Sequence, residues 1–244
     1  MALGPDNKFT LRTAKANASE RHYSDIDVGL RTYMLKVYNY MCMGLALTGA
    51  VAFAASTSDS LMQAIYGSPL RWLVMLAPLG IVFFLAAKVN SMAASTAQTV
   101  FWIFAGVMGL SLSYIFLVYT GASITRVFFI TAGAFAGLSL YGYTTKRDLS
   151  AMGTFMVMGL IGIIIASVVN IFLESSGLQF VISVLGVLIF AGLTAYDTQK
   201  IKSMYLDSDA NEVSEKKAVM GALSLYLDFI NMFIFLLHLF GNRE

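Results

Sequence analysis

The stretch Leu223–Phe233 reads LSLYLDFINMF, and the apolar run continues to Phe240, so Asp228 stands inside a segment that is otherwise suited to lipid. The whole chain shares this character: 58% of its 244 residues are hydrophobic, 12% are charged, and the mean hydropathy is +0.73. An ordinary soluble domain carries roughly 25% charged residues. The composition therefore predicts an all-α polytopic membrane protein whose surface is solvated mainly by the lipid bilayer.

Seven stretches of the chain are long and apolar enough to cross a bilayer, which takes about 20 residues in a helix. They are 33–56, 70–90, 97–119, 124–143, 152–173, 178–204 and 217–240. We expect a cytoplasmic N-terminal tail over 1–32, a seven-helix transmembrane domain over 33–240 and a short C-terminal tail over 241–244. Leu206–Lys217 (LDSDANEVSEKK) is too polar to insert and is expected to be a loop.

The basic residues predict the orientation, because Lys and Arg favour cytoplasmic loops. With the N-terminus inside, nearly all of the sixteen Lys and Arg residues fall on the cytoplasmic side, and only Arg71, Arg126 and Arg243 fall outside. We therefore expect a cytoplasmic N-terminus and an external C-terminus. The GxxxG pattern of Gly133 and Gly137 predicts a helix contact on the fourth span, since small residues let helices approach each other closely in lipid.

The remaining composition excludes several classes of function. A net charge of +2 is too small to indicate nucleic acid binding. One cysteine, Cys42, and two histidines, His22 and His238, are too few for a structural zinc site, which takes about four ligands. We expect no resident cofactor and no enzyme activity.

The last span carries polar or small residues at alternating steps of three and four, which place them on one face of a helix. This face comprises Gly221, Ser224, Asp228, Asn231, Phe235 and His238. A lipid-exposed helix would not carry such a stripe, so we expect the other spans to enclose it, with Ser224, Asn231 and His238 as polar lining. A purely structural interpretation also accounts for Asp228 and Asn231, as hydrogen-bonding contacts between helices.

A second carboxylate lies near the cytoplasmic end of the sixth span, in AYDTQKIK (195–202). An ionisable group inside a span costs about 2.5–3.5 kcal/mol and usually faces the bundle interior. Counted from the cytoplasmic edge, Asp197 and Asp228 differ in depth by only about 4–5 Å at 1.5 Å per helical residue, so they can meet across antiparallel helices. Two such carboxylates tend to share a proton and form a sensor of pH. Lys88 is the candidate basic partner, although it also fits a lysine that extends to the interface.

These residues identify a family resemblance. The motifs AYDTQKIK (195–202) and LSLYLDFINMF (223–233), with GLSLYGYTTKRDLS (137–150) and the seven spans, resemble the Bax inhibitor-1 family in its bacterial inner-membrane branch. The resemblance covers the chain from about Tyr33 onward. It implies six helices wrapped around a central seventh, and a pH-sensitive calcium leak controlled by an aspartate pair that corresponds to Asp197 and Asp228.

The small number of oxygen ligands near the two aspartates limits how calcium can bind. A stable Ca²⁺ site wants six to eight oxygen ligands, so we expect transient passage of calcium at Asp197 and Asp228 rather than tight binding. The expected partners are therefore the bilayer, calcium ions and protons.

Two other functions fit parts of the sequence. Bacterial relatives are thought to restrain a membrane-embedded AAA protease, and a regulator of that kind needs no transport. Its contact with the protease would lie in the N-terminal tail. An intramembrane aspartyl protease also needs two aspartates on adjacent spans and has a YD motif, as in Tyr196–Asp197. Its second motif, GxGD, does not occur in this sequence.

Overall fold

The protein is a bundle of long helices, described here from a computed structural model over residues 5–243, with side chains from residue 28 onward. The elements are α1 (Pro5–Ser56), α2 (Asp59–Tyr66), α3 (Leu70–Lys88), α4 (Ala94–Leu112), α5 (Ile115–Val118), α6 (Gly121–Thr144), α7 (Ser150–Leu173), α8 (Ser176–Ser203) and α9 (Asn211–Phe240). Within the described residues, seven segments are long and apolar enough to span a membrane. The predicted all-helical, seven-span architecture is confirmed.

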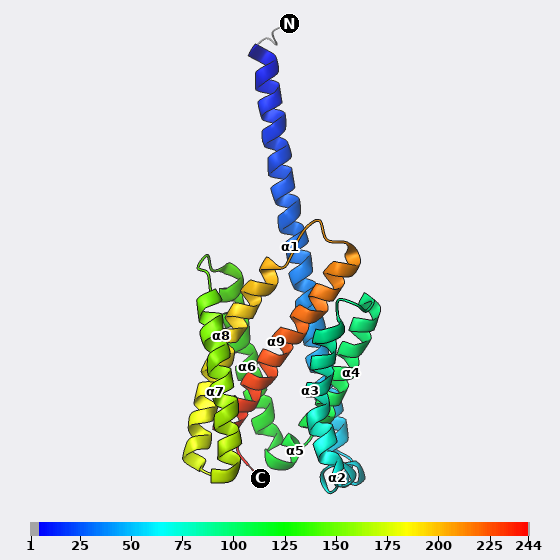
Figure 1. The fold of residues 1–244 in the computed structure, drawn as a ribbon, viewed down its shortest axis with the longest axis vertical. Coiled ribbons are helices and arrows are strands. Elements are labelled where there is room, and N and C mark those ends of the chain that lie inside the picture. Colours follow the sequence, from blue (N-terminus) through cyan, green and yellow to red (C-terminus); the bar gives the residue numbers. More distant parts are fainter. Residues whose placement is uncertain (1–4, 244) are drawn as a thin grey trace.

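Helix α9 is the centre of the bundle. In its most apolar 18-residue window 67% of the residues are buried, against 6% for α7. It packs against α8, α1, α6 and α4, while α3 packs mainly on α4 and α7 mainly on α8. Figure 1 shows α9 crossing the bundle obliquely, between the pair α7 and α8 on one side and the pair α3 and α4 on the other. The expected arrangement of helices around a central seventh span is therefore found.

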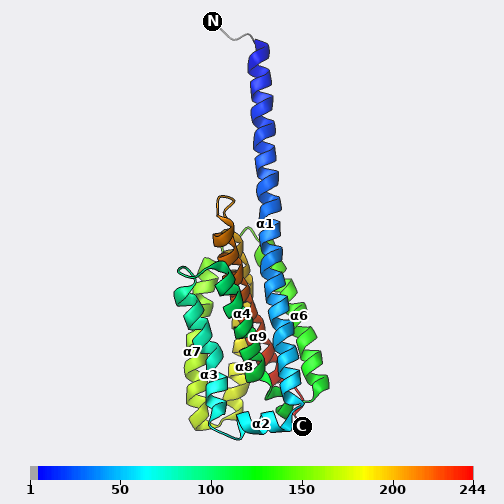
Figure 2. The same cartoon turned by 90° about the vertical axis from the view of Figure 1, so that its right-hand side faces the viewer.

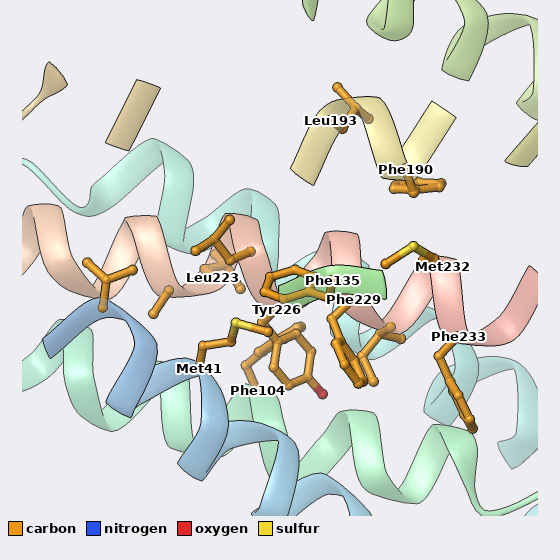
Figure 3. Packing of buried hydrophobic residues seen from close by; sticks show 14 of the residues in the cluster. Met41, Phe104, Phe135, Phe190, Leu193, Leu223, Tyr226, Phe229, Met232 and Phe233 are labelled. Carbon is orange, nitrogen blue, oxygen red and sulfur yellow. The ribbon is translucent and has the colours of Figure 1, made fainter. Parts of the chain in front are cut away.

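The core around α9 is aromatic and includes a buried polar connection between three helices. Figure 3 shows Tyr226 of α9 packed near Met41 and Phe104. The Tyr226 hydroxyl lies 2.6 Å from Thr48 Oγ1, which in turn donates to the Ala105 carbonyl at 2.8 Å. Because the single hydroxyl hydrogen of Thr48 is used in the bond to Ala105, the Tyr226 hydroxyl is the donor to Thr48. This chain of bonds joins α9, α1 and α4 inside the bundle.

Small residues set the closest helix contacts, although not at the predicted pair Gly133 and Gly137. A side-chain atom at Gly142 of α6 would collide with the Ala195 carbonyl of α8, so only glycine permits this approach. Gly133 and Gly137 have open space beside them, so the expected GxxxG contact is not made. The pattern alone did not indicate which face of α6 is turned toward the bundle.

Two predicted boundaries differ from the structure. The third span is interrupted at Ser113–Tyr114, which separates α4 from α5. The polar segment Leu206–Lys217 is a loop only as far as residue 210, because α9 already begins at Asn211. Glu212 and Lys216 pair one turn apart at 3.3 Å, and Glu215 accepts bonds from Lys36, Tyr40 and Gln98. These contacts hold a charged first turn as helix outside the apolar region.

The two ends of the bundle differ in charge. We call the end that carries Lys88, Arg147, Lys202 and Lys217 the basic end, and the opposite one, where the chain finishes, the C-terminal end. Figure 2 shows α1 extending beyond the bundle at the basic end as one unbroken helix. The predicted cytoplasmic tail over 1–32 stays a prediction, and its residues 1–4 lie outside the described residues. The final residues pack against α6, where Asn242 bonds to Thr120 and Ser123.

Candidate functional site

A cavity of about 900 Å³ lies beside α9 and is walled by α3, α4, α7 and α8. We call it the aspartate cavity because Asp197 and Asp228 both line it. The rest of its lining is mostly aliphatic and aromatic and includes Pro78 of α3 and Ile163 of α7. A cavity of this size and low polarity, with a few convergent polar groups, has the character of a functional site rather than of a packing defect.

Asp228 occupies the deepest part of this site. Its side chain is only 4% exposed, and its Oδ2 has no hydrogen-bond partner among the described residues. Ser224 and Asn231 lie one turn before and one turn after it and line the same cavity. The Asn231 amide donates to the Leu227 carbonyl of its own helix at 2.8 Å, so it does not satisfy the carboxylate. A buried carboxylate without a partner is costly, so its presence calls for a functional reason.

Asp197 reaches the cavity from α8 and is half-buried. The two carboxylates therefore share one chamber, and no hydrogen bond joins them among the described residues. The depth comparison made from the sequence therefore placed both side chains in one site.

The basic residue in this site is Lys200, not Lys88. Lys200 lines the aspartate cavity one turn after Asp197, and its Nζ lies 5.8 Å from the centre of the Tyr196 ring. Lys88 is exposed at the end of α3 and forms no ion pair within the described part of the chain. The sequence could have indicated Lys200, because a residue three positions after Asp197 lies on the same face of a helix.

The predicted polar lining is divided between two cavities. Ser224 and Asn231 line the aspartate cavity, whereas His238 lines a separate space of about 380 Å³, which we call the C-terminal cavity. Glu174, Gln179 and Arg243 line that space as well. His238 Nδ1 has no hydrogen-bond partner among the described residues. His238 therefore belongs to the far end of the stripe, beyond the reach of the carboxylates.

An aromatic pair lies along α8 and α9 between the residues of these two cavities. Phe190 of α8 and Phe235 of α9 both line the aspartate cavity, and each lies along its helix between the carboxylate and the residues of the C-terminal cavity. Gly186 provides the room, since a Cβ there would lie 2.5 Å from the Phe235 ring. Sequence reasoning placed Phe235 on the stripe but did not assign it a function, because a phenylalanine among eighteen carries no signal without its neighbours.

A third cavity of about 360 Å³ adjoins the aspartate cavity at the basic end. The two share Tyr196 and Lys200. Asp148 lines this basic-end cavity, and hydrogen bonds from the side chain and the backbone N–H of Ser150 hold its pKa below the usual range. Gln199 closes the rim by accepting from Leu149 N–H and donating to the Arg147 carbonyl.

The profile of the family described as "Inhibitor of apoptosis-promoting Bax1" matches residues 30–244 of this chain. The chain belongs to the Bax inhibitor-1 family. The matched region begins inside α1 and includes Asp197, Asp228 and the aromatic pair, so the whole site lies within the part that the family shares.

Relatives within the Bax inhibitor-1 family match along nearly their full length. RP147 of Rickettsia prowazekii is 48% identical over 98% of this chain and 99% of its own. The inner membrane protein YbhL of Escherichia coli is 46% identical over 88% of this chain and 94% of its own. A protein of Caulobacter vibrioides is 43% identical over 98% of this chain and 100% of its own. This chain is thus an integral multi-pass membrane protein of the Bax inhibitor-1 family.

Proposed function

We propose that this protein is a pH-sensitive leak pathway for cations, with calcium as the transported ion and Asp197 and Asp228 as the proton-responsive pair. The observation that carries the proposal is that both carboxylates face one cavity within the bundle, and that the deeper one, Asp228, has an oxygen without a partner. A purely structural aspartate would be expected to bond to a neighbouring helix, and Asp228 does not do so among the described residues.

The sign of the pH response follows from the charges. In a chamber of low dielectric two carboxylates cannot both ionise easily, so at low pH the site is neutral or carries a single charge. As pH rises the second proton leaves, and the doubly negative chamber attracts a divalent cation. Lys200 competes for Asp197 from the same wall. We therefore expect the leak to increase as pH rises.

The donor set suits passage rather than storage. The chamber offers two carboxylates with Ser224 and Asn231, fewer oxygens than the six to eight that a stable calcium site requires. An ion that binds too tightly does not leave, so weak, incomplete coordination favours conduction.

The three cavities define a route along α8 and α9. It begins at the polar C-terminal cavity, meets the Phe190–Phe235 pair, enters the aspartate cavity and leaves past Tyr196 and Lys200 into the basic-end cavity. Because apolar constrictions block ions by excluding water, the aromatic pair makes the described conformation a closed one. Repulsion between two ionised carboxylates, one on α8 and one on α9, would separate the same two helices that hold the aromatic rings.

We also propose a bacterial inner membrane as the location, because the relative YbhL is named an inner membrane protein. The excess of Lys and Arg at the basic end favours a cytoplasmic position for that end and for the N-terminal part of α1. Cations would then enter from the C-terminal cavity.

The test is calcium flux into vesicles that contain the purified protein and a calcium-sensitive dye, measured across a pH series. Asp228→Asn mimics the protonated carboxyl and is expected to give low flux that no longer increases with pH. Asp207→Asn, the same change in the exposed α8–α9 loop, should behave as the wild type. Unchanged flux and unchanged pH dependence in Asp228→Asn would contradict the proposal. A wild-type protein without flux at any pH would contradict it too and would favour regulation of a membrane-bound AAA protease.

A further inference from the structure

A second large groove lies on the opposite side of α9, between α1 and α6, and it has no part in the proposed route. Its volume is about 780 Å³, and Phe229 of α9 contributes to its lining. Figure 2 shows α1 and α6 running side by side along this face of the bundle. We call this feature the α1–α6 groove. Its walls are nearly all apolar, with Leu35 and Ala46 on α1 and Ala136 on α6 among them.

The few polar groups inside the α1–α6 groove are already satisfied. The Tyr38 hydroxyl lies 2.5 Å from Ser139 Oγ, and Ser139 Oγ lies 2.9 Å from Thr198 Oγ1, which donates to the Thr194 carbonyl. Away from Arg31 and Tyr143 at one end, the walls are therefore almost entirely apolar. An apolar cavity does not hold water and suits an apolar ligand.

Charge is concentrated at one end of the groove. Arg31 lines it at the basic end, and its side chain is exposed. Tyr143 lies at the same end, and Lys202 donates to its carbonyl at 2.8 Å with Nζ 4.8 Å from the centre of its ring. Arg31 therefore lines the mouth of an apolar groove, and Lys202 lies next to that mouth through its contact with Tyr143. Guanidinium groups bind phosphate through paired hydrogen bonds, and basic pockets between transmembrane helices bind anionic lipid headgroups.

The length of the groove fits a lipid tail that hangs from such a headgroup. Its lining on α1 extends from Arg31 to Ala46, which corresponds to about 22 Å of helix at 1.5 Å per residue. One leaflet of the hydrocarbon core is about 15 Å thick. A chain that starts at the basic mouth can thus follow the groove through its whole leaflet.

We propose that the α1–α6 groove is a specific site for an anionic phospholipid, with one acyl chain between α1 and α6 and the phosphate against Arg31 and Lys202. The bound chain completes the packing of α9 on the side away from the aspartate cavity. A transmembrane helix of another protein or a second copy of this chain is the competing occupant, and neither accounts for the two cations at the mouth.

The test measures lipid retained by the full-length protein after reconstitution in an equal mixture of phosphatidylglycerol and phosphatidylethanolamine, extraction in mild detergent and washing. The wild type should retain phosphatidylglycerol in excess over phosphatidylethanolamine. Ala136→Phe fills the groove and should lose the retained lipid. Ala86→Phe, the same change at an exposed alanine of α3 outside both cavities, should retain it.

The charge at the mouth is tested separately. Arg31→Ala should retain lipid without preference for phosphatidylglycerol, and Arg31→Lys should restore part of the preference. Gel filtration and thermal unfolding of each variant show whether it is folded and in which oligomeric state. Retention of the two lipids in the input ratio by the wild type, or wild-type retention in Ala136→Phe, would overturn the proposal. A dimer that Ala136→Phe converts to a monomer, with lipid retention unchanged, would assign the groove to a second copy instead.

Discussion

Phe190 of α8 and Phe235 of α9 stack with ring centroids 6.0 Å apart and an interplanar angle of 27°, and both line the aspartate cavity. His238 meets the edge of the Phe235 ring from the other side, with centroids 6.4 Å apart. The two rings come from the same two helices as Asp197 and Asp228. Movement of α8 relative to α9 therefore changes the carboxylate pair and the aromatic pair together.

Removing one ring is expected to open the route. Phe235→Ala should raise calcium flux at every pH and weaken its dependence on pH, because the apolar constriction is lost while the carboxylates remain. The matched control is Phe233→Ala, a buried phenylalanine of the same helix that does not line the aspartate cavity. Each change is expected to cost about 3–5 kcal/mol of stability, so the midpoint of thermal unfolding should fall by a similar amount in both variants. Equal flux in the two variants would show that the aromatic pair is not the closure.

The two carboxylates are expected to act as one unit. Asp197→Asn and Asp228→Asn should each abolish the increase of flux with pH, and the double variant should add little to either single one. Changes at interacting sites are not additive, whereas those at independent sites add within about 0.3–0.5 kcal/mol. Flux across the pH series for the wild type and the three variants measures the coupling. Full additivity would mean that the aspartates share a cavity without sharing a proton.

The buried hydroxyl chain is expected to matter for stability and not for the pH response. Tyr226→Phe removes the donor to Thr48 in a fully buried position, which should cost about 0.5–1.5 kcal/mol. The midpoint of unfolding should therefore fall, while flux keeps its normal pH dependence. Tyr141→Phe, on the exposed surface of α6, serves as the control and should leave the midpoint unchanged.

Two glycines of α6 offer a test of the helix packing. Gly142→Ala would press a methyl group on the Ala195 carbonyl of α8 and should destabilise the protein, by about 1–3 kcal/mol as for other overpacked sites. Gly137→Ala meets open space and should be neutral or stabilise by up to about 1 kcal/mol through helix propensity. Thermal unfolding of both variants in the same detergent measures the difference. The reverse order would mean that α6 is turned differently against α8.

The fold and the aspartate site could be predicted from the sequence because both rest on rules that lipid makes strict. An aspartate in an apolar run must face inward, and the polar stripe on α9 identified the enclosed helix. The partner Lys200 was missed because the charge pattern places it at the interface, and only the rotation of α8 turns it toward the cavity. The same missing information, the rotation of α6, made Gly137 rather than Gly142 the predicted contact. Gly186 and Phe235 come from different helices, and no local pattern connects them.

The outer walls of the aspartate cavity, α3 and α7, are attached to the rest of the bundle chiefly through α4 and α8. Most of the remaining surface of α7 faces lipid, since only 6% of its most apolar window is buried. The bilayer is therefore a structural component of the chamber wall, and its lateral pressure acts directly on the chamber's width. We expect the thickness and tension of the surrounding membrane to set the basal calcium flux, which protonation of the aspartates then changes.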